Sequence, residues 1–145
     1  MVDPSQPLSS QGRKEVETIA GAFLRTGLSL EAILHSEKLR AHQTAEILHK
    51  KLQEIPQLLS FSYLKPNDPI EPLLRELDAY ESLMVVGHLP YLEQLLAYLL
   101  TNQNSVPIIK LSTAALAALS EENGRWQLDW LITPDLISPS QSHLC

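Results

Sequence analysis

The sequence predicts an α/β fold in which a mostly parallel central sheet carries helices on both faces and is followed by an antiparallel C-terminal hairpin. Short apolar runs alternate with longer segments whose apolar residues recur at helical spacing. The run 83–86 is apolar without interruption, which suits an interior strand covered on both faces of a parallel sheet. Near the C-terminus, segments 114–119 and 126–131 flank Glu121-Glu122-Asn123-Gly124, a typical hairpin turn.

Local signals place the elements along the chain. The expected elements, in order, are a helix from Ser9 or Ser10 to Gly27, a strand at 30–35, a helix at 37–52, a weak edge strand at 58–64, a loop at 66–69, a helix around 70–80, the strand at 83–86 and a helix at 91–100. Either serine is a typical N-cap, and Gly27 is a typical C-cap. We expect the strand at 83–86 to pair in parallel with the strand at 30–35.

The length and composition indicate one globular domain. The 145 residues, 44% of them hydrophobic and 19% charged, suit a single domain at 1–137 with a frayed tail at 138–145. A net charge of -6 argues against a general nucleic-acid binder. No apolar run approaches the roughly 18 residues of a membrane span, and residues 1–7 lack the features of a signal peptide. Cys145 is the single cysteine, so no intrachain disulfide is expected, and a cytoplasmic protein is the default.

Two side chains are candidates for a phosphate site. His88 follows the strand at 83–86 after Gly87, where an open α/β sheet usually places its ligand. Gly87 has no side chain, so we expect backbone or ligand to approach closely there. Arg40 lies near the start of the helix at 37–52, a suitable place for an oxyanion. Either residue alone is more often structural or solvated, but an arginine fork and an imidazole brought together from two strand ends predict phosphate binding.

The remaining titratable residues favour structural interpretations. His42 and His49 are seven residues apart on one predicted helix, whereas metal-binding pairs on helices prefer closer spacing. We therefore expect no metal and no cofactor. Asp68, in the loop at 66–69, is the one carboxylate considered for proton transfer, and the sequence contains no Gly-rich phosphate loop and no Gly-x-Ser-x-Gly elbow.

Several segments, in order over nearly the whole chain, resemble the SixA-type phosphohistidine phosphatases of the histidine phosphatase superfamily. They are Pro7-Leu8-Ser9-Ser10-Gln11-Gly12, the strand ending at Ser36, Leu39-Arg40-Ala41-His42-Gln43-Thr44-Ala45, Val85-Val86-Gly87-His88-Leu89-Pro90, and 130–136 with Pro134. The arginine segment and the Gly-His-Leu-Pro segment are fairly specific. Glu37 departs from the pattern, because many relatives have proline at this position.

The resemblance implies a two-step phosphoryl transfer. In this family, the histidine of an N-terminal Arg-His-Gly motif attacks phosphorus, and water then hydrolyses the phosphoenzyme. A second arginine and a second histidine hold the phosphoryl oxygens, and these match Arg40 and His88. The substrate implied is a phosphohistidine protein or a small phosphoester, and the lack of lid-like insertions mildly favours a protein surface.

The attacking histidine of the family has no counterpart in this sequence. No Arg-His-Gly occurs in the 145 residues, and only Met1 to Gln6 precede the segment that begins at Pro7. We expect a chain truncated at its N-terminus, poorly active as written, whose sheet lacks the family's central first strand. A partner chain or rearranged segment would fill that position, which predicts self-association. The alternatives are a non-catalytic phosphate-recognition or interaction module of the same fold, and a structural domain without a ligand.

Overall fold

A three-stranded parallel sheet lies at the centre of the computed structural model, which describes residues 6–55, 57–103 and 106–137. Its strands are β1 (Ala32–His35), β2 (Gln57–Ser60) and β3 (Leu83–Val86), in the order β2-β1-β3. The register of β1 with β3 runs from Ala32 opposite Leu83 to His35 opposite Val86. The predicted parallel pairing of these two strands is therefore confirmed.

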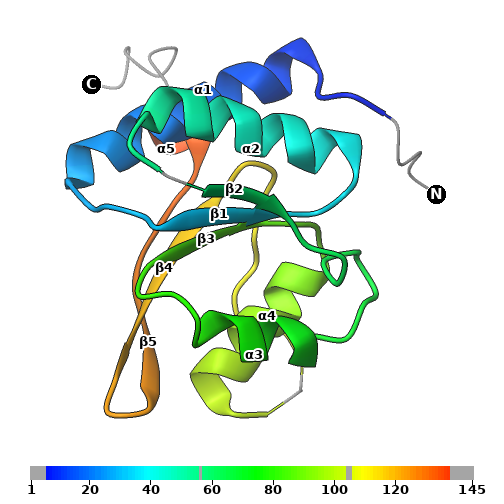
Figure 1. Ribbon diagram of the computed structural model, residues 1–145, viewed down its shortest axis with the longest axis vertical. Coiled ribbons are helices and arrows are strands. Elements are labelled where there is room, and N and C mark those ends of the chain that lie inside the picture. The colour runs from blue at the N-terminus through cyan, green and yellow to red at the C-terminus, as the bar shows by residue number, and fades with distance from the viewer. Residues whose placement is uncertain (1–5, 56, 104–105, 138–145) are drawn as a thin grey trace.

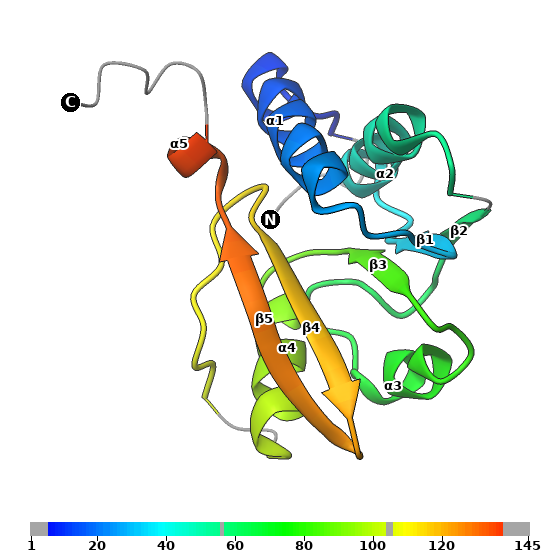
Figure 2. The same ribbon diagram turned by 90° about the vertical axis from the view of Figure 1, so that its left-hand side faces the viewer.

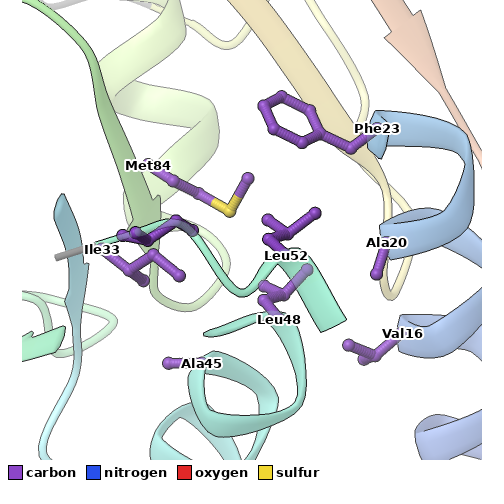
Figure 3. Packing of buried hydrophobic residues seen from close by; sticks show 9 residues of the cluster. Val16, Ala20, Phe23, Ile33, Ala45, Leu48, Leu52 and Met84 are labelled. Carbon is purple, nitrogen blue, oxygen red and sulfur yellow. The ribbon is translucent and has the colours of Figure 1, made fainter. Parts of the chain in front are cut away.

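Helices cover both faces of this sheet (Figure 1). One layer holds α1 (Ser10–Thr26) and α2 (Leu39–Leu52), and the other holds α3 (Glu71–Leu77) and α4 (Tyr91–Thr101). Because successive strand residues point to opposite faces, Ile33 of β1 joins the core under α1 and α2, while Leu34 joins the core under α3 and α4. In the first core, the side chain of Met84 points toward Leu52 (Figure 3). The α/β prediction is confirmed.

A two-stranded antiparallel hairpin completes the described chain. It consists of β4 (Leu116–Glu122) and β5 (Arg125–Ile132), is followed by the short helix α5 (Pro134–Ile137), and stands beside the parallel sheet (Figure 2). Asn123 and Gly124 have φ values of 55° and 76°, the positive angles that a two-residue type I′ turn requires. The predicted hairpin is confirmed, but its turn is shorter than predicted, because Glu121 and Glu122 belong to β4.

The caps of α1, the bounds of β3 and the start of α4 match the sequence prediction, whereas several other boundaries differ. Ser9 is the N-cap, since its side chain accepts a hydrogen bond from the Gly12 N–H, and Gly27 ends the helix in the left-handed conformation. The helix predicted at 37–52 begins only at Leu39, because Lys38 is its extended N-cap residue. The strand predicted at 58–64 ends at Ser60, and the helix predicted around 70–80 covers only Glu71–Leu77.

The position of β3 corrects one prediction. In the described residues β3 pairs only with β1, and the hairpin forms a separate sheet, so β3 is an edge strand rather than an interior one. The interior strand is β1, whose four residues are all buried, while three of the four β3 residues are half-buried. The predicted tail at 138–145 lies outside the described residues. Among those that are described, no helix has the length and apolarity to cross a membrane.

Candidate phosphate-binding site

A cavity of about 400 Å³ separates β3 from the segment that leads into β4. Much of its wall is apolar, with side chains from α1, α2, β3 and β4 that include Val16, Ile19, Leu48, Met84 and Leu116. Lys38, Arg40 and His88 contribute the nitrogen-bearing side chains of the wall. They follow the carboxyl ends of β1 and β3, the edge at which open parallel sheets bind ligands. The cavity therefore combines an apolar body with a cationic rim.

The loop after β3 brings His88 to this cavity. The strand ends at Val86, and the half-buried imidazole of His88 has its Nε2 atom 2.8 Å from Ser36 Oγ. Ser36 follows β1 directly and is 1% exposed, so the contact joins the ends of neighbouring strands. A Cβ atom added at Gly87 would lie 3.5 Å from the nearest Leu92 carbon and 3.7 Å from the Leu64 carbonyl oxygen, so no backbone of the described residues approaches this glycine unusually closely.

The first turn of α2 brings Arg40 to the same wall. Its guanidinium has no carboxylate partner among the ion pairs of the described residues, and it is therefore available to an anion. One turn further along α2, the side chain of Gln43 accepts a hydrogen bond from the Leu8 N–H at 2.8 Å. This bond fixes the segment before α1 against α2, and Leu8 also lines the cavity.

Burial and nearby positive charges together alter the protonation of His88. Partial burial, followed by the nearby charges of Lys38 and Arg40, lowers the pKa of His88 from 6.5 to about 4. The imidazole is consequently neutral at physiological pH, and a bound anion would raise the pKa again by favouring the charged ring. A pocket in which cations lie close together without a carboxylate is electrostatically suited to an oxyanion.

The other candidates from the sequence lie elsewhere. His42 Nδ1 is 3.4 Å from His35 Nε2, and His42 Nε2 is 3.6 Å from a Glu46 carboxylate oxygen. His49 Nε2 bonds to the carbonyl of Ile55 at 2.9 Å. Asp68 accepts a hydrogen bond from the Lys65 N–H at 2.9 Å and so closes a turn. No group of three or more histidine, cysteine or acidic side chains within the described ranges is arranged to hold a metal ion.

Sequence reasoning missed two residues of this site, Ser36 and Lys38. A signal was nevertheless present, because both follow the strand that ends at His35, just as His88 follows β3. In a parallel sheet, residues after adjacent strands meet at one edge. Applied to every strand end, this rule places Ser36 and Lys38 at the same edge of the sheet as His88, although it does not give the contact between Ser36 and His88.

The fold and the site define a class of protein, an open parallel α/β sheet with a cationic pocket at the carboxyl ends of its strands. Within this class, the chain has the fold of the SixA-type histidine phosphatases. It superposes on the protein histidine phosphatase SixA complexed with tungstate with a TM-score of 0.84, at 24% identity, over 94% of this chain and 90% of that one.

Two further solved structures share this fold. A SixA-type protein of Agrobacterium tumefaciens gives a TM-score of 0.77 at 25% identity, over 92% of this chain and 87% of that one. A SixA-type protein of Nakamurella multipartitia gives 0.68 at 21% identity, over 92% and 88% of the two chains. The agreement over nearly the whole described chain confirms the predicted SixA-type fold.

Comparison with curated sequences adds one relative without a known activity. An uncharacterized protein of Picosynechococcus sp. is 36% identical over 94 residues, which are 61% of this chain and 56% of the relative. The match thus spans just over half the length of the curated relative. No family model matches the sequence.

Proposed function

We propose that this protein is a phosphohistidine phosphatase-like phosphoryl hydrolase in which Arg40 and His88 hold the phosphoryl group. One observation carries the proposal: Lys38, Arg40 and His88 line one cavity at the carboxyl ends of β1 and β3, with no ion-pairing carboxylate among the described residues. Phosphoryl transfer depends mainly on positioning and on stabilising negative charge. A guanidinium fork and an imidazole supply both.

The substrate in this proposal is a phosphorylated protein carrying phosphohistidine, or a small phosphoester, in cytoplasmic signalling. The likeness to the SixA complex with tungstate, an oxyanion, supports an oxyanion in this pocket. A phosphorylated side chain would be held at its phosphoryl end by Lys38, Arg40 and His88, which line the polar part of the cavity.

The 145 residues contain no Arg-His-Gly, the motif whose histidine attacks phosphorus in the family that the sequence resembles. Neither Arg40 nor any lysine is a good nucleophile toward phosphorus when protonated, and His88 is needed as an oxyanion partner. The cavity borders strands that each have one paired edge, β3 and β4, and its walls are apolar. We propose that a strand ending in Arg-His-Gly would lie there, paired with β3, and would bring its histidine to the phosphoryl group held by Arg40 and His88.

A comparison of two proteins tests this proposal. The 145-residue chain and a version with an N-terminal apolar strand ending in Arg-His-Gly are assayed on a phosphohistidine peptide and on an aryl phosphate. We expect little or no turnover by the short chain, and turnover with an acid-labile phosphoenzyme by the extended one. The extended version with its added histidine changed to alanine is the matched control and should be inactive.

Two results would contradict the proposal. Brisk turnover by the short chain, abolished in a His88→Ala variant, would show that His88 is the nucleophile. Inactivity of both versions, with phosphate still bound, would favour a phosphate-recognition module instead.

A further inference from the structure

Ser36 is held by hydrogen bonds on every polar group that it carries. Its backbone N–H donates to the carbonyl of Val86 at 2.9 Å, and its own carbonyl accepts from His35 Nδ1 at 2.9 Å. Its hydroxyl oxygen accepts from the Lys38 N–H at 3.2 Å and lies 2.8 Å from His88 Nε2. With 1% of the residue exposed, this hydroxyl has little access to water. Its position and its partners are therefore fixed.

These contacts decide the direction of the hydrogen bond to His88. The Lys38 N–H can only donate, so it uses a lone pair of the hydroxyl oxygen. Among the described residues, the structure offers the Ser36 hydroxyl proton no acceptor other than His88 Nε2. A buried hydroxyl that donates to nothing is strongly disfavoured. The hydroxyl therefore donates to Nε2, and this nitrogen carries the lone pair of a neutral ring.

We propose that Ser36 is a positioning residue that holds His88 in the tautomer with its proton on Nδ1, so that a neutral imidazole presents an N–H donor to an anion in the cavity. The inference rests on the proposed phosphate-binding role of His88. Ser36 does not line the cavity, whereas His88 does, so Nε2 is engaged by a residue outside the cavity wall. Nδ1 has no hydrogen-bond partner within the described part of the chain and is left for the ligand.

The electrostatics of the site make this tautomer useful. Burial and the charges of Lys38 and Arg40 lower the pKa of His88 to about 4, so the ring is neutral at pH 7. A neutral imidazole has one donor and one acceptor nitrogen, and the opposite tautomer would turn a lone pair toward the anion. A hydroxyl partner also tolerates protonation of the ring, because its oxygen can accept a hydrogen bond from Nε2–H when its own proton rotates away.

The tautomer is measurable without any substrate. The full 145-residue chain is labelled with ¹⁵N, and two-bond ¹H–¹⁵N spectra of its histidine rings are recorded at pH 7, with His88 assigned through a His88→Gln variant. We expect Nδ1 of His88 to be the protonated nitrogen and Nε2 the unprotonated one. In a Ser36→Ala variant the ring should shift toward a mixture containing the Nε2–H tautomer. The matched control is Thr101→Ala, which removes a hydroxyl bonded only within and just beyond α4, and it should leave the His88 pattern unchanged.

Sulfate binding supplies the second readout, because sulfate does not titrate near neutral pH. We expect Ser36→Ala to weaken sulfate binding at pH 7 roughly 3- to 10-fold, the effect of one ordinary hydrogen bond. Ser36→Thr keeps the hydroxyl and should restore both the tautomer and the affinity. Thr101→Ala should bind sulfate like the parent chain.

The outcomes separate this proposal from the proposed function. A parent chain whose His88 carries its proton on Nε2 overturns the role of Ser36, even if sulfate binds, and this result requires no variant to fold. A Ser36→Ala variant with the parent tautomer and affinity overturns it as well. The expected tautomer in a chain that binds neither sulfate nor phosphate would support the Ser36–His88 contact while contradicting the phosphate site.

Discussion

At the scale of single residues, the protein places like charges next to one another and leaves them without a counter-ion among the described residues. Lys38 and Arg40 both act on His88 strongly enough to contribute to its lowered pKa. An anion in the cavity would interact favourably with Lys38, Arg40 and His88, whereas the positive charges of these side chains disfavour one another. This arrangement makes the affinity for an anion sensitive to each side chain.

Arg40 should contribute most of this affinity. An Arg40→Ala variant loses a charge-assisted contact of about 1.5–3 kcal/mol, so phosphate or sulfate affinity should fall roughly ten-fold or more. Isothermal titration at low ionic strength measures the change. Arg25→Ala, which removes an exposed arginine in the last turn of α1, is the matched control and should bind like the parent chain. Equal affinity of Arg40→Ala and the parent chain would remove the proposed site.

His88 should make the protein less stable in mild acid. The unfolded chain binds a proton at His88 below about pH 6.5, whereas the folded ring stays neutral down to about pH 4. The contribution of His88 to the free energy of unfolding is therefore fully present above pH 6.5 and is lost as the pH falls from 6.5 to 4. Urea unfolding of the parent chain and of His88→Gln between pH 7.5 and 4 should show a smaller loss in the variant. Parallel losses in the two proteins would contradict the lowered pKa.

Arg40 and His88 could be chosen from the sequence because each follows a recognisable strand by a few residues. Ser36 and Lys38 occupy equivalent places but carry no distinctive motif of their own. Their roles depend on a hydrogen bond and a charge contact between segments about 50 residues apart in the chain. The register of the sheet sets such contacts, and local sequence patterns do not predict which side chains meet across it.

At the scale of elements, a side-chain cap decided which of two serines precedes the first helix. The sequence left Ser9 and Ser10 as alternative N-caps of the first helix, and the structure selects Ser9, whose Oγ is 2.9 Å from the Gly12 nitrogen. Only this serine satisfies one of the free N–H groups of the first turn. Lys38 and Pro90, the N-cap residues of α2 and α4, form no such side-chain bond.

The two serines provide a direct comparison of capping. Ser9→Ala should lower the free energy of unfolding by about 1 kcal/mol, because the Gly12 N–H loses its acceptor. Ser10→Ala lies one residue further on, in the helix itself, and should change stability by less than about 0.5 kcal/mol. Urea denaturation of both variants measures the difference. Equal effects would show that the cap does not stabilise α1.

The incorrect placement of β3 has a physical cause. An uninterrupted apolar run predicts that both faces of a strand are covered by other elements. This holds for the sheet here, because α2 and α4 lie on its opposite faces. The edges of a strand carry backbone N–H and C=O groups, which are the same for every residue type. The pattern Leu83–Val86 therefore predicts covered faces and contains no information on whether one or both edges are paired.

At the scale of the whole molecule, the described chain forms two sheets rather than one. The three-stranded sheet ends at β3 and the hairpin begins its own sheet at β4, with the cavity between them. Unpaired strand edges bordering apolar walls favour association with another strand. The same opening that admits a ligand is therefore a place where a second chain can add.

We expect the 145-residue chain to self-associate for this reason. Sedimentation velocity at several concentrations should show a species heavier than the 16.2 kDa monomer. The extended version with an added N-terminal strand should be less associated, because that strand would cover the edges of β3 and β4. A short chain that stays strictly monomeric, with its sheet intact by circular dichroism, would contradict this prediction.

The sequence by itself determined the element types, the parallel pairing of the strand at 83–86, the hairpin and the resemblance that the superpositions confirm as a SixA-type fold. These follow from side-chain periodicity, caps and turn residues, which act within a few positions of one another. The tertiary structure alone decided that β3 is an edge, that a cavity separates it from β4, and that Ser36 faces His88. Each of these depends on backbone edges or on contacts between distant segments, and the physical reason is that such groups leave no trace in local hydrophobic spacing.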